Sequence, residues 1–287
     1  MVQRSSKMES RQNKYIGNRP GGPKSARDDK SEMIFGTRPI LEALTAGKEL
    51  EKIFLQRGAK NPATDEIVQL AKRFEVPVVT VPLEKLNNLT RKNHQGAVAL
   101  ISPISYVPLQ ETVTALFEQG KNPLLLILDR VTDVRNFGSI ARNAECMGVD
   151  AIVIPSRGGA QINADAVKTS DRALHLVPVC REPNLKDTQD YLKEFGYQVV
   201  ACTEKTEQNL TDANLDMVGP MAIIMGSEED GISPEYLKRA DARVRIPLMG
   251  QIGSLNVSVA TGIILYEAMR QRLRESSHSS HGSEGLR

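Results

Sequence analysis

The segment 129–148 (D-R-V-T-D-V-R-N-F-G-S-I-A-R-N-A-E-C-M-G) combines an amphipathic helix pattern with polar side chains at the helix entry. Asn136 and Gly138 stand at that entry, and Arg142 follows one turn further on, opposite the apolar positions. Exposed N–H groups near a helix N-terminus favour anions, and a planar guanidinium can bind two phosphate oxygens at once. The pattern therefore predicts that Arg142 binds a phosphate; a solvated arginine on the polar face of the helix is the alternative reading.

A second polar segment, I-I-M-G-S-E-E-D-G-I-S at 223–233, follows an apolar run directly. Glycines at 226 and 231 permit left-handed turns and a close approach of the backbone to a ligand. The acids between them lack the regular alternation of a calcium loop. Glu228 or a neighbouring acid could accept hydrogen bonds from a ribose or an arginine. An ordinary charged turn remains the other interpretation.

The third segment, 245–262, is a glycine-containing loop that leads into Ser254-Leu255-Asn256 at a helix start. Serine and asparagine are natural helix N-caps, so capping alone would explain Ser254 and Asn256. A helix cap does not require a loop of this length with two polar side chains at its end. The segment thus predicts either a second ligand-binding loop or a plain helix cap.

All three segments follow predicted strands of one parallel sheet, and ligands bind beyond the carboxyl ends of such strands. Apolar runs separated by helical patterns indicate a sheet that is buried on both faces. We expect its strands at 124–128, 151–154, 176–179, 198–202, 221–225 and 243–247, with a last helix at about 256–273. The predicted fold class is α/β.

A smaller α/β domain precedes this sheet. Helices are expected from Thr37 to Gly47 and from Asn61 to about Phe74, and strands at 52–55, 78–81 and 97–101. The small domain is expected at 33–103 and the large domain at 123–274, joined by a linker at 104–122 that contains a helix at 109–119. A disordered basic arm is expected at 1–32 and a disordered tail at 275–287.

Composition excludes several classes of protein. The 287 residues are 40% hydrophobic and 25% charged, the balance of a globular protein, and they contain neither a membrane-span pattern nor a secretory signal. Three scattered cysteines and four histidines indicate a reducing, cytoplasmic setting and no metal site. The arm has eight basic residues against four acids, whereas residues 33–274 have 28 against 29. An electrostatic attraction for nucleic acid must therefore be local or lie in the arm, which otherwise is a solvated tail.

The chain resembles the SpoU/TrmH family of SPOUT-class RNA methyltransferases in all three polar segments. The family's motifs are matched, in order and spacing, by N-F-G-S-I-A-R-N-A (136–144), I-M-G-S-E-x-x-G (224–231) and I-P-L-M-G-Q-I-G-S-L-N-V-S-V-A (246–260). The segments 34–44 and 94–99 are similar to the substrate-binding domain of bacterial 23S rRNA guanosine 2'-O-methyltransferases.

The resemblance implies more than the patterns do. It implies a deep trefoil knot in the parallel-sheet domain, S-adenosylmethionine as methyl donor, and a homodimer with its active sites at the subunit interface. The donor would be held by Gly226, Ile246, Leu248 and Leu255. Arg142 would be the central catalytic residue. The remaining catalytic residues that the motifs imply are Asn136, Glu228, Ser254 and Asn256.

The substrate is the least determined feature. The leading interpretation is 2'-O-methylation of a guanosine in 23S rRNA; the alternatives are another rRNA site, tRNA, or a non-catalytic RNA-binding assembly protein. The small domain argues against tRNA, because minimal tRNA enzymes of the family lack it. Arg130 and Arg135 depart from the residues usual in close relatives, so they either alter RNA contacts or are simply exposed.

Overall fold

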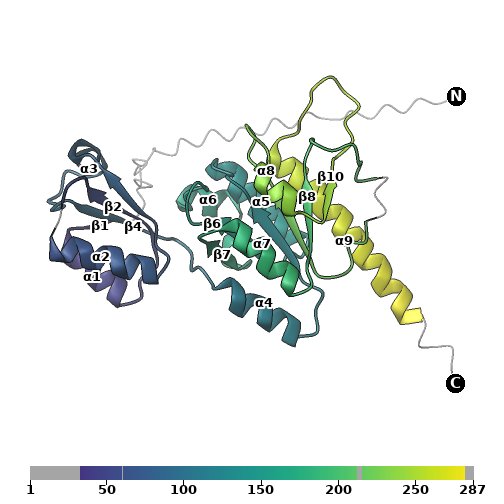
Figure 1. Ribbon diagram of the computed structural model, residues 1–287, viewed down its shortest axis with the longest axis horizontal. Helices are drawn as coiled ribbons and strands as arrows, with labels where there is room; N and C mark the ends of the chain where they lie inside the picture. The colour runs from purple at the N-terminus through teal and green to yellow at the C-terminus, as the bar shows by residue number, and fades with distance from the viewer. Residues whose placement is uncertain (1–32, 60, 212–214, 282–287) are drawn as a thin grey trace, which may run out of the picture. The chain divides into compact units, whose positions relative to one another are not determined.

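A computed structural model of the chain describes residues 33–59, 61–211 and 215–281, with side chains up to Ser277 (Figure 1). The predicted arm at 1–32 and residues 282–287 of the predicted tail lie outside the described residues. No helix in the described ranges is both long enough and apolar enough to span a membrane.

The first sheet has four strands in the order β1-β4-β2-β3. The strands are β1 (Met33–Phe35), β2 (Leu50–Gln56), β3 (Val78–Val81) and β4 (Ala97–Ile101). Strand β2 pairs with β3 in parallel and with β4 in antiparallel orientation, so the sheet is mixed. Helices α1 (Thr37–Thr45) and α2 (Pro62–Arg73) cover one face, while α3 (Leu83–Leu89) places Leu86 in the apolar cluster of the other face.

The helix starts of this sheet follow local sequence chemistry. Asn61 caps α2: its side chain accepts from the Thr64 N–H, and the Thr64 hydroxyl oxygen accepts from the Asn61 N–H. Helix α1 begins at Thr37, as predicted, and the residue at its N-cap position is Gly36, with a φ of 91°. Strand β1 and helix α3 were not predicted, since each is too short for its periodicity to show.

The second sheet has six parallel strands in the order β10-β8-β9-β5-β6-β7. These are β5 (Leu124–Leu128), β6 (Ala151–Pro155), β7 (Val179–Glu182), β8 (Gln198–Cys202), β9 (Met221–Met225) and β10 (Ala242–Val244). Along β5, residues 124, 126 and 128 enter one apolar cluster and residues 125 and 127 the other. Both faces of the sheet are therefore buried, as the continuous apolar runs predicted.

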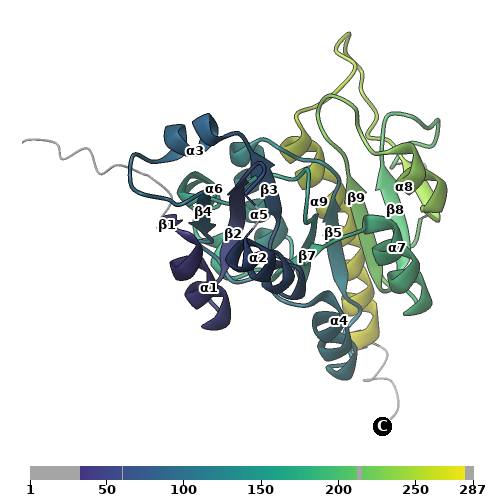
Figure 2. The ribbon, with the colours of Figure 1, turned by 60° about the vertical axis from the view of Figure 1, so that its left-hand side comes forward.

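Helices cover the two faces of the second sheet (Figures 1 and 2). One face carries α5 (Val134–Cys146), α6 (Ala164–Thr169), the 3-10 turn η1 (Ala173–His175) and α9 (Val257–His281). The other face carries α4 (Leu109–Glu118), α7 (Leu185–Glu194) and α8 (Pro234–Arg239). Helix α5 packs directly against α9, and this pairing positions most of the site residues. The α/β class and the parallel sheet are confirmed; the trefoil knot stays a prediction.

Three predicted elements are corrected. Strand β7 lies at Val179–Glu182 and not at 176–179, because Pro178 interrupts the run and Leu176 is exposed. Strand β10 ends at Val244, so Pro247 belongs to the following loop. Helix α9 continues to His281, past the expected end at Leu273 and into the segment that we expected to be disordered.

Candidate active site

The candidate site lies at the carboxyl ends of β5 and β9, which are neighbours in the second sheet. Leu128 pairs with Met225 at the end of the two strands, and the Asp129 N–H donates to the Met225 carbonyl oxygen (2.8 Å). The chain segments that begin with Asp129 and Gly226 therefore leave the sheet side by side. Ligand sites of parallel sheets form at such carboxyl edges.

The turn after β9 is very tight. A Cβ atom at Gly226 would stand 2.2 Å from the Gly231 carbonyl carbon and 2.3 Å from the Ile232 nitrogen, so no larger residue fits without a backbone shift. The Gly231 N–H donates to the Ser227 carbonyl oxygen (3.1 Å), and Gly231 adopts a φ of 69°. Glycine is needed at 226 for space and is favoured at 231 for its conformation.

Asn256 connects the three polar segments at the start of α9. Its side-chain oxygen accepts from the Ser258 N–H (3.0 Å) and the Ser258 hydroxyl (2.6 Å), which caps the helix. Its side-chain nitrogen donates to Asn136 Oδ1 (3.0 Å) and to Glu228 Oε1 (2.6 Å). The geometry is compatible with both interpretations of Asn256: it caps the helix and it also contacts two other predicted site residues.

A cavity of about 850 Å³ opens beside this network, between the turn after β9 and the loop 245–255. All four residues expected to hold the donor line it: Gly226, Ile246, Leu248 and Leu255. Its volume is in the range of small-molecule sites. The wall combines the turn 226–231, which carries exposed acidic side chains, with apolar side chains of the loop 245–255.

Cys202 also lines this cavity, and its protonation bears on methyl chemistry. Burial raises the pKa of the Cys202 thiol to about 12, and the charge of Glu204 adds to the effect. The thiol therefore stays protonated at neutral pH, and it is the thiolate form of cysteine that acts as a nucleophile. Cys202 is accordingly a wall residue of the cavity with a protonated side chain.

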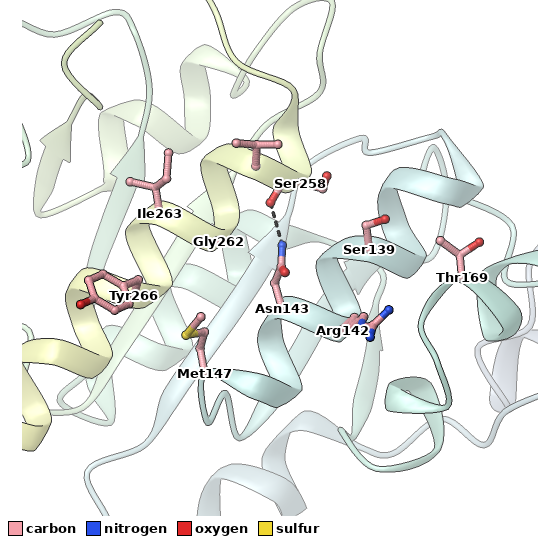
Figure 3. Close-up of a pocket in the computed structure, with 10 residues that line it drawn as sticks. Ser139, Arg142, Asn143, Met147, Thr169, Ser258, Gly262, Ile263 and Tyr266 are labelled. Carbon is pink, nitrogen blue, oxygen red and sulfur yellow. Dashed lines mark hydrogen bonds between the residues drawn. The ribbon is translucent and has the colours of Figure 1, made fainter. Parts of the chain in front are cut away.

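Arg142 lies in a second cavity, of about 700 Å³, between α5 and α9 (Figure 3). Ser139, Arg142 and Asn143 contribute from α5, and Ser258 and Tyr266 from α9. The Asn143 side-chain nitrogen donates to the Ser258 carbonyl oxygen (2.8 Å) and ties the two helices together. Arg142 Nη2 stands 3.3 Å from Asp171 Oδ2, in an ion pair whose side chains are 58% and 69% exposed.

The structure brings three of the five predicted catalytic residues into hydrogen-bond contact: Asn136, Glu228 and Asn256. Ser254 lines the cavity of about 850 Å³ and has no hydrogen-bond partner among the described residues, and Arg142 lies in the other cavity. The same described ranges contain no cluster of three side chains that could hold a metal ion.

Sequence reasoning missed Asn143 and Asp171 as contacts of this region. Asn143 lies within the first motif, next to Arg142, and that position was the only available signal. Asp171 has no signal in the sequence, because it reaches Arg142 from the segment between α6 and η1. The two adjacent residues Asp171 and Arg172 both have a positive φ, of 51° and 73°.

Comparison with known proteins identifies the family of both parts of the chain. Residues 123–266 match the model of the SpoU rRNA Methylase family, and residues 33–107 match the model described as RNA 2'-O ribose methyltransferase substrate binding. A Staphylococcus haemolyticus relative, assigned by name to the TrmH family of tRNA/rRNA methyltransferases, is 36% identical over 84% of this chain and 96% of its own.

Solved structures show the same fold. An AdoMet-bound rRNA methyltransferase from Sinorhizobium meliloti matches 84% of this chain and 87% of its own, with a TM-score of 0.53 and 26% identity. The A. aeolicus TrmH/SpoU tRNA modifying enzyme matches 60% of this chain and 87% of its own, with a TM-score of 0.50 and 32% identity.

Fold, motifs and comparisons together define an RNA methyltransferase of the α/β class. The chain belongs to the SpoU family of RNA methyltransferases. This membership confirms the family resemblance and the prediction of an enzyme whose methyl donor is S-adenosylmethionine.

Proposed function

We propose that the chain transfers a methyl group from S-adenosylmethionine to the ribose 2'-hydroxyl of a guanosine in 23S rRNA. The observation that carries the proposal is the Asn256 network, which joins the three polar segments at the rim of the cavity of about 850 Å³. A protein that only binds RNA has no evident use for a polar network of this kind beside a small-molecule cavity.

The small domain supports rRNA over tRNA as the substrate. Residues 33–107 match a substrate-binding family model, so this part of the chain has a role in presenting RNA. The A. aeolicus tRNA modifying enzyme is matched by only 60% of this chain, although 87% of that enzyme is covered. An enzyme that acts on tRNA thus manages largely without the additional segment.

The donor-side cavity is proposed to hold S-adenosylmethionine through Gly226, Ile246, Leu248 and Leu255. When bound, the donor supplies a methyl group on a positively charged sulfonium. The polar residues of the turn 226–231 line the cavity and can hydrogen-bond the polar parts of the molecule. Leu248 and Leu255 are 39% and 38% exposed, and they offer apolar contact to the adenine ring.

The chain's own residues would act mainly by placing the hydroxyl. Holding two reacting groups at near-attack distance is worth up to ~7–11 kcal/mol in favourable cases. We assign to Arg142 the binding and orientation of a substrate phosphate or of the hydroxyl, since a guanidinium is a donor and not a base at neutral pH. A substrate phosphate or a water then accepts the proton. Asn136, Glu228, Ser254 and Asn256 are the residues proposed to position the ribose.

We also infer a homodimer, because apolar side chains beside both cavities face solvent in a single chain. Met249 and Ile252 in the loop 245–255 are 99% and 80% exposed, and Val259 and Tyr266 on α9 are 51% and 53% exposed. Large apolar side chains that are exposed beside a site in this way mark a candidate protein interface. Light scattering at assay concentration should give twice the mass of one chain. The enzyme is proposed to act in the cytoplasm, on ribosomal RNA.

The direct test is methyl transfer from radiolabelled S-adenosylmethionine to total ribosomal RNA and, separately, to transfer RNA. The label should appear at a single 23S rRNA guanosine, at a linkage that resists alkali because its 2'-oxygen is methylated. Label found only in tRNA would retain the chemistry and overturn the substrate. Absence of label from both RNAs, together with no binding of the donor, would overturn the function itself.

A further inference from the structure

Arg130 is the second residue after β5, and it has an unusual backbone. Its φ is 55°, in the left-handed region that non-glycine residues seldom adopt. Such a conformation persists where the surrounding contacts fix it, and it is frequent at functional sites. The side chain is 37% exposed, so apolar burial does not account for the conformation.

The guanidinium of Arg130 contacts both of the segments that leave the sheet at the candidate site. It donates through Nε to Asp129 Oδ1 (3.1 Å) and through Nη1 to Asp230 Oδ2 (3.0 Å). It also donates through Nη2 to the Gly231 carbonyl oxygen (3.2 Å). One side chain thus links the loop after β5 to the far end of the tight turn after β9.

Asp129 completes this connection from a buried position. It is 2% exposed, and its Oδ2 accepts from both the N–H and the hydroxyl of Ser233, each at 2.7 Å. Ser233 directly precedes α8. The pair Asp129–Arg130 therefore holds the chain at Asp230, Gly231 and Ser233, on both sides of Ile232, which is itself buried.

The turn held in this way carries residues of the donor-side cavity. Gly226 to Gly231 all line that cavity, and Glu228 within the turn accepts from Asn256. Arg130 itself does not line it. We propose that Arg130 is a positioning residue that fixes the 226–231 turn in its ligand-binding conformation before S-adenosylmethionine arrives. The proposal rests on the assignment of this cavity to the donor under Proposed function.

This role answers the question that the sequence left open about Arg130. A contact with RNA would leave the guanidinium free for phosphate, whereas here it is engaged by two carboxylates and a carbonyl oxygen. Arg135 provides the contrast: it belongs to the same segment and is exposed at the first turn of α5. Of the two arginines, Arg130 is the one that is hydrogen-bonded to the turn that lines the cavity.

The test is calorimetric binding of S-adenosylmethionine in the absence of RNA, with the full chain. Arg130→Ala should weaken donor binding by about tenfold or more, because charge-assisted hydrogen bonds are lost from a binding loop. Arg130→Lys should recover part of the affinity, since an ammonium reaches fewer of the acceptors than the planar fork does. Arg135→Ala is the matched control and should bind the donor as the wild type does.

Kinetics separate positioning from a general loss of structure. Arg130→Ala should raise the KM for the donor and leave the KM for RNA unchanged. Should Arg130→Ala fail to fold, Asp230→Asn removes one partner alone and should weaken donor binding about threefold. Unchanged donor affinity, or a rise in the KM for RNA alone, would overturn the inference. Failure of the wild type to bind the donor would instead overturn the assignment of the cavity.

Discussion

The two cavities that flank the start of α9 are built differently. On the donor side, Asn256, Glu228, Asn136, Arg130 and Asp129 are joined to one another or to the backbone by hydrogen bonds within one chain. On the other side, Arg142 forms an ion pair with Asp171, and both side chains are more than half exposed. An exposed pair of this kind contributes about 0–1 kcal/mol.

The difference indicates which contacts the folded chain forms by itself and which contacts depend on a bound ligand. The donor side is organised before binding, so little ordering is left for a small molecule to impose. Arg142 is held weakly, and a phosphate can replace Asp171 as its partner at small cost. Apolar residues of α9 beside Arg142 face solvent, and in the proposed homodimer a second copy of the chain would cover them.

The largest expected effect is on the Arg142 side and concerns turnover alone. Arg142→Ala should lower single-turnover methyl transfer by about a thousandfold, the scale of losing a donor aimed at developing charge. Donor affinity, measured by calorimetry, should stay as in the wild type because Arg142 does not line that cavity. Lys168→Ala, an exposed cation on the neighbouring α6, is the control. Wild-type turnover of Arg142→Ala would remove Arg142 from the mechanism.

A smaller effect is expected at Asn256, where two roles can be separated. Asn256→Ser keeps a helix cap but loses the nitrogen that reaches Asn136 and Glu228, whereas Asn256→Ala loses both. Both variants should lower turnover by about ten- to a hundredfold. Only Asn256→Ala should also lose about 1 kcal/mol of stability, seen in urea unfolding. Turnover that follows stability through the two variants would mean that capping is the sole role.

The smallest effect concerns Glu182, a half-buried carboxylate at the end of β7 that lines neither cavity. Burial raises its pKa to about 7, and the nearby charge of Glu75 adds to this. The folded protein therefore holds a proton that the unfolded chain, with a pKa near 4.5, has lost, so stability falls as the pH rises from 4.5 to 7.

Replacing this carboxyl by an amide should remove that pH dependence. Glu182→Gln should raise the unfolding temperature by a few degrees at pH 8 and leave it unchanged at pH 4, with methyl transfer unaffected. Glu194→Gln, at the exposed end of α7, serves as the comparison. Equal shifts at both pH values would show that the carboxyl is not protonated in the folded state near pH 6.

Sequence patterns predicted the centre of the molecule better than its edges. The strands at 124–128, 198–202 and 221–225 agree with β5, β8 and β9, because each is a largely apolar run with buried residues on both faces of the sheet. Strands β7 and β10 lie at the two edges of the sheet, where pairing on one side only and nearby prolines blur the pattern. The last turns of α9 were not predicted, because the Ser/His-rich composition after Leu273 is typical of disordered tails and says nothing about whether the preceding helix continues.

The sequence predicted which residues belong to the candidate site, but it did not predict which of them contact one another. The motifs named Asn136, Glu228 and Asn256, yet the hydrogen bonds that join them span 28 and 120 positions in the sequence. Arg130 and Asp230 are separated by 100 positions, and neither segment contains a pattern that predicts contact with the other. Such pairings follow from the β5–β9 register, which no local spacing encodes.

The position of Asn256 late in the chain matters for protein that is still being synthesised. Its side chain both starts α9 and closes the network with Asn136 and Glu228, and it follows every strand of both sheets in the chain. Domains form as synthesis proceeds from the N-terminus. A growing chain that ends before α9 contains every strand but lacks Asn256, so under the proposed function truncated products of this kind should not transfer methyl groups to RNA.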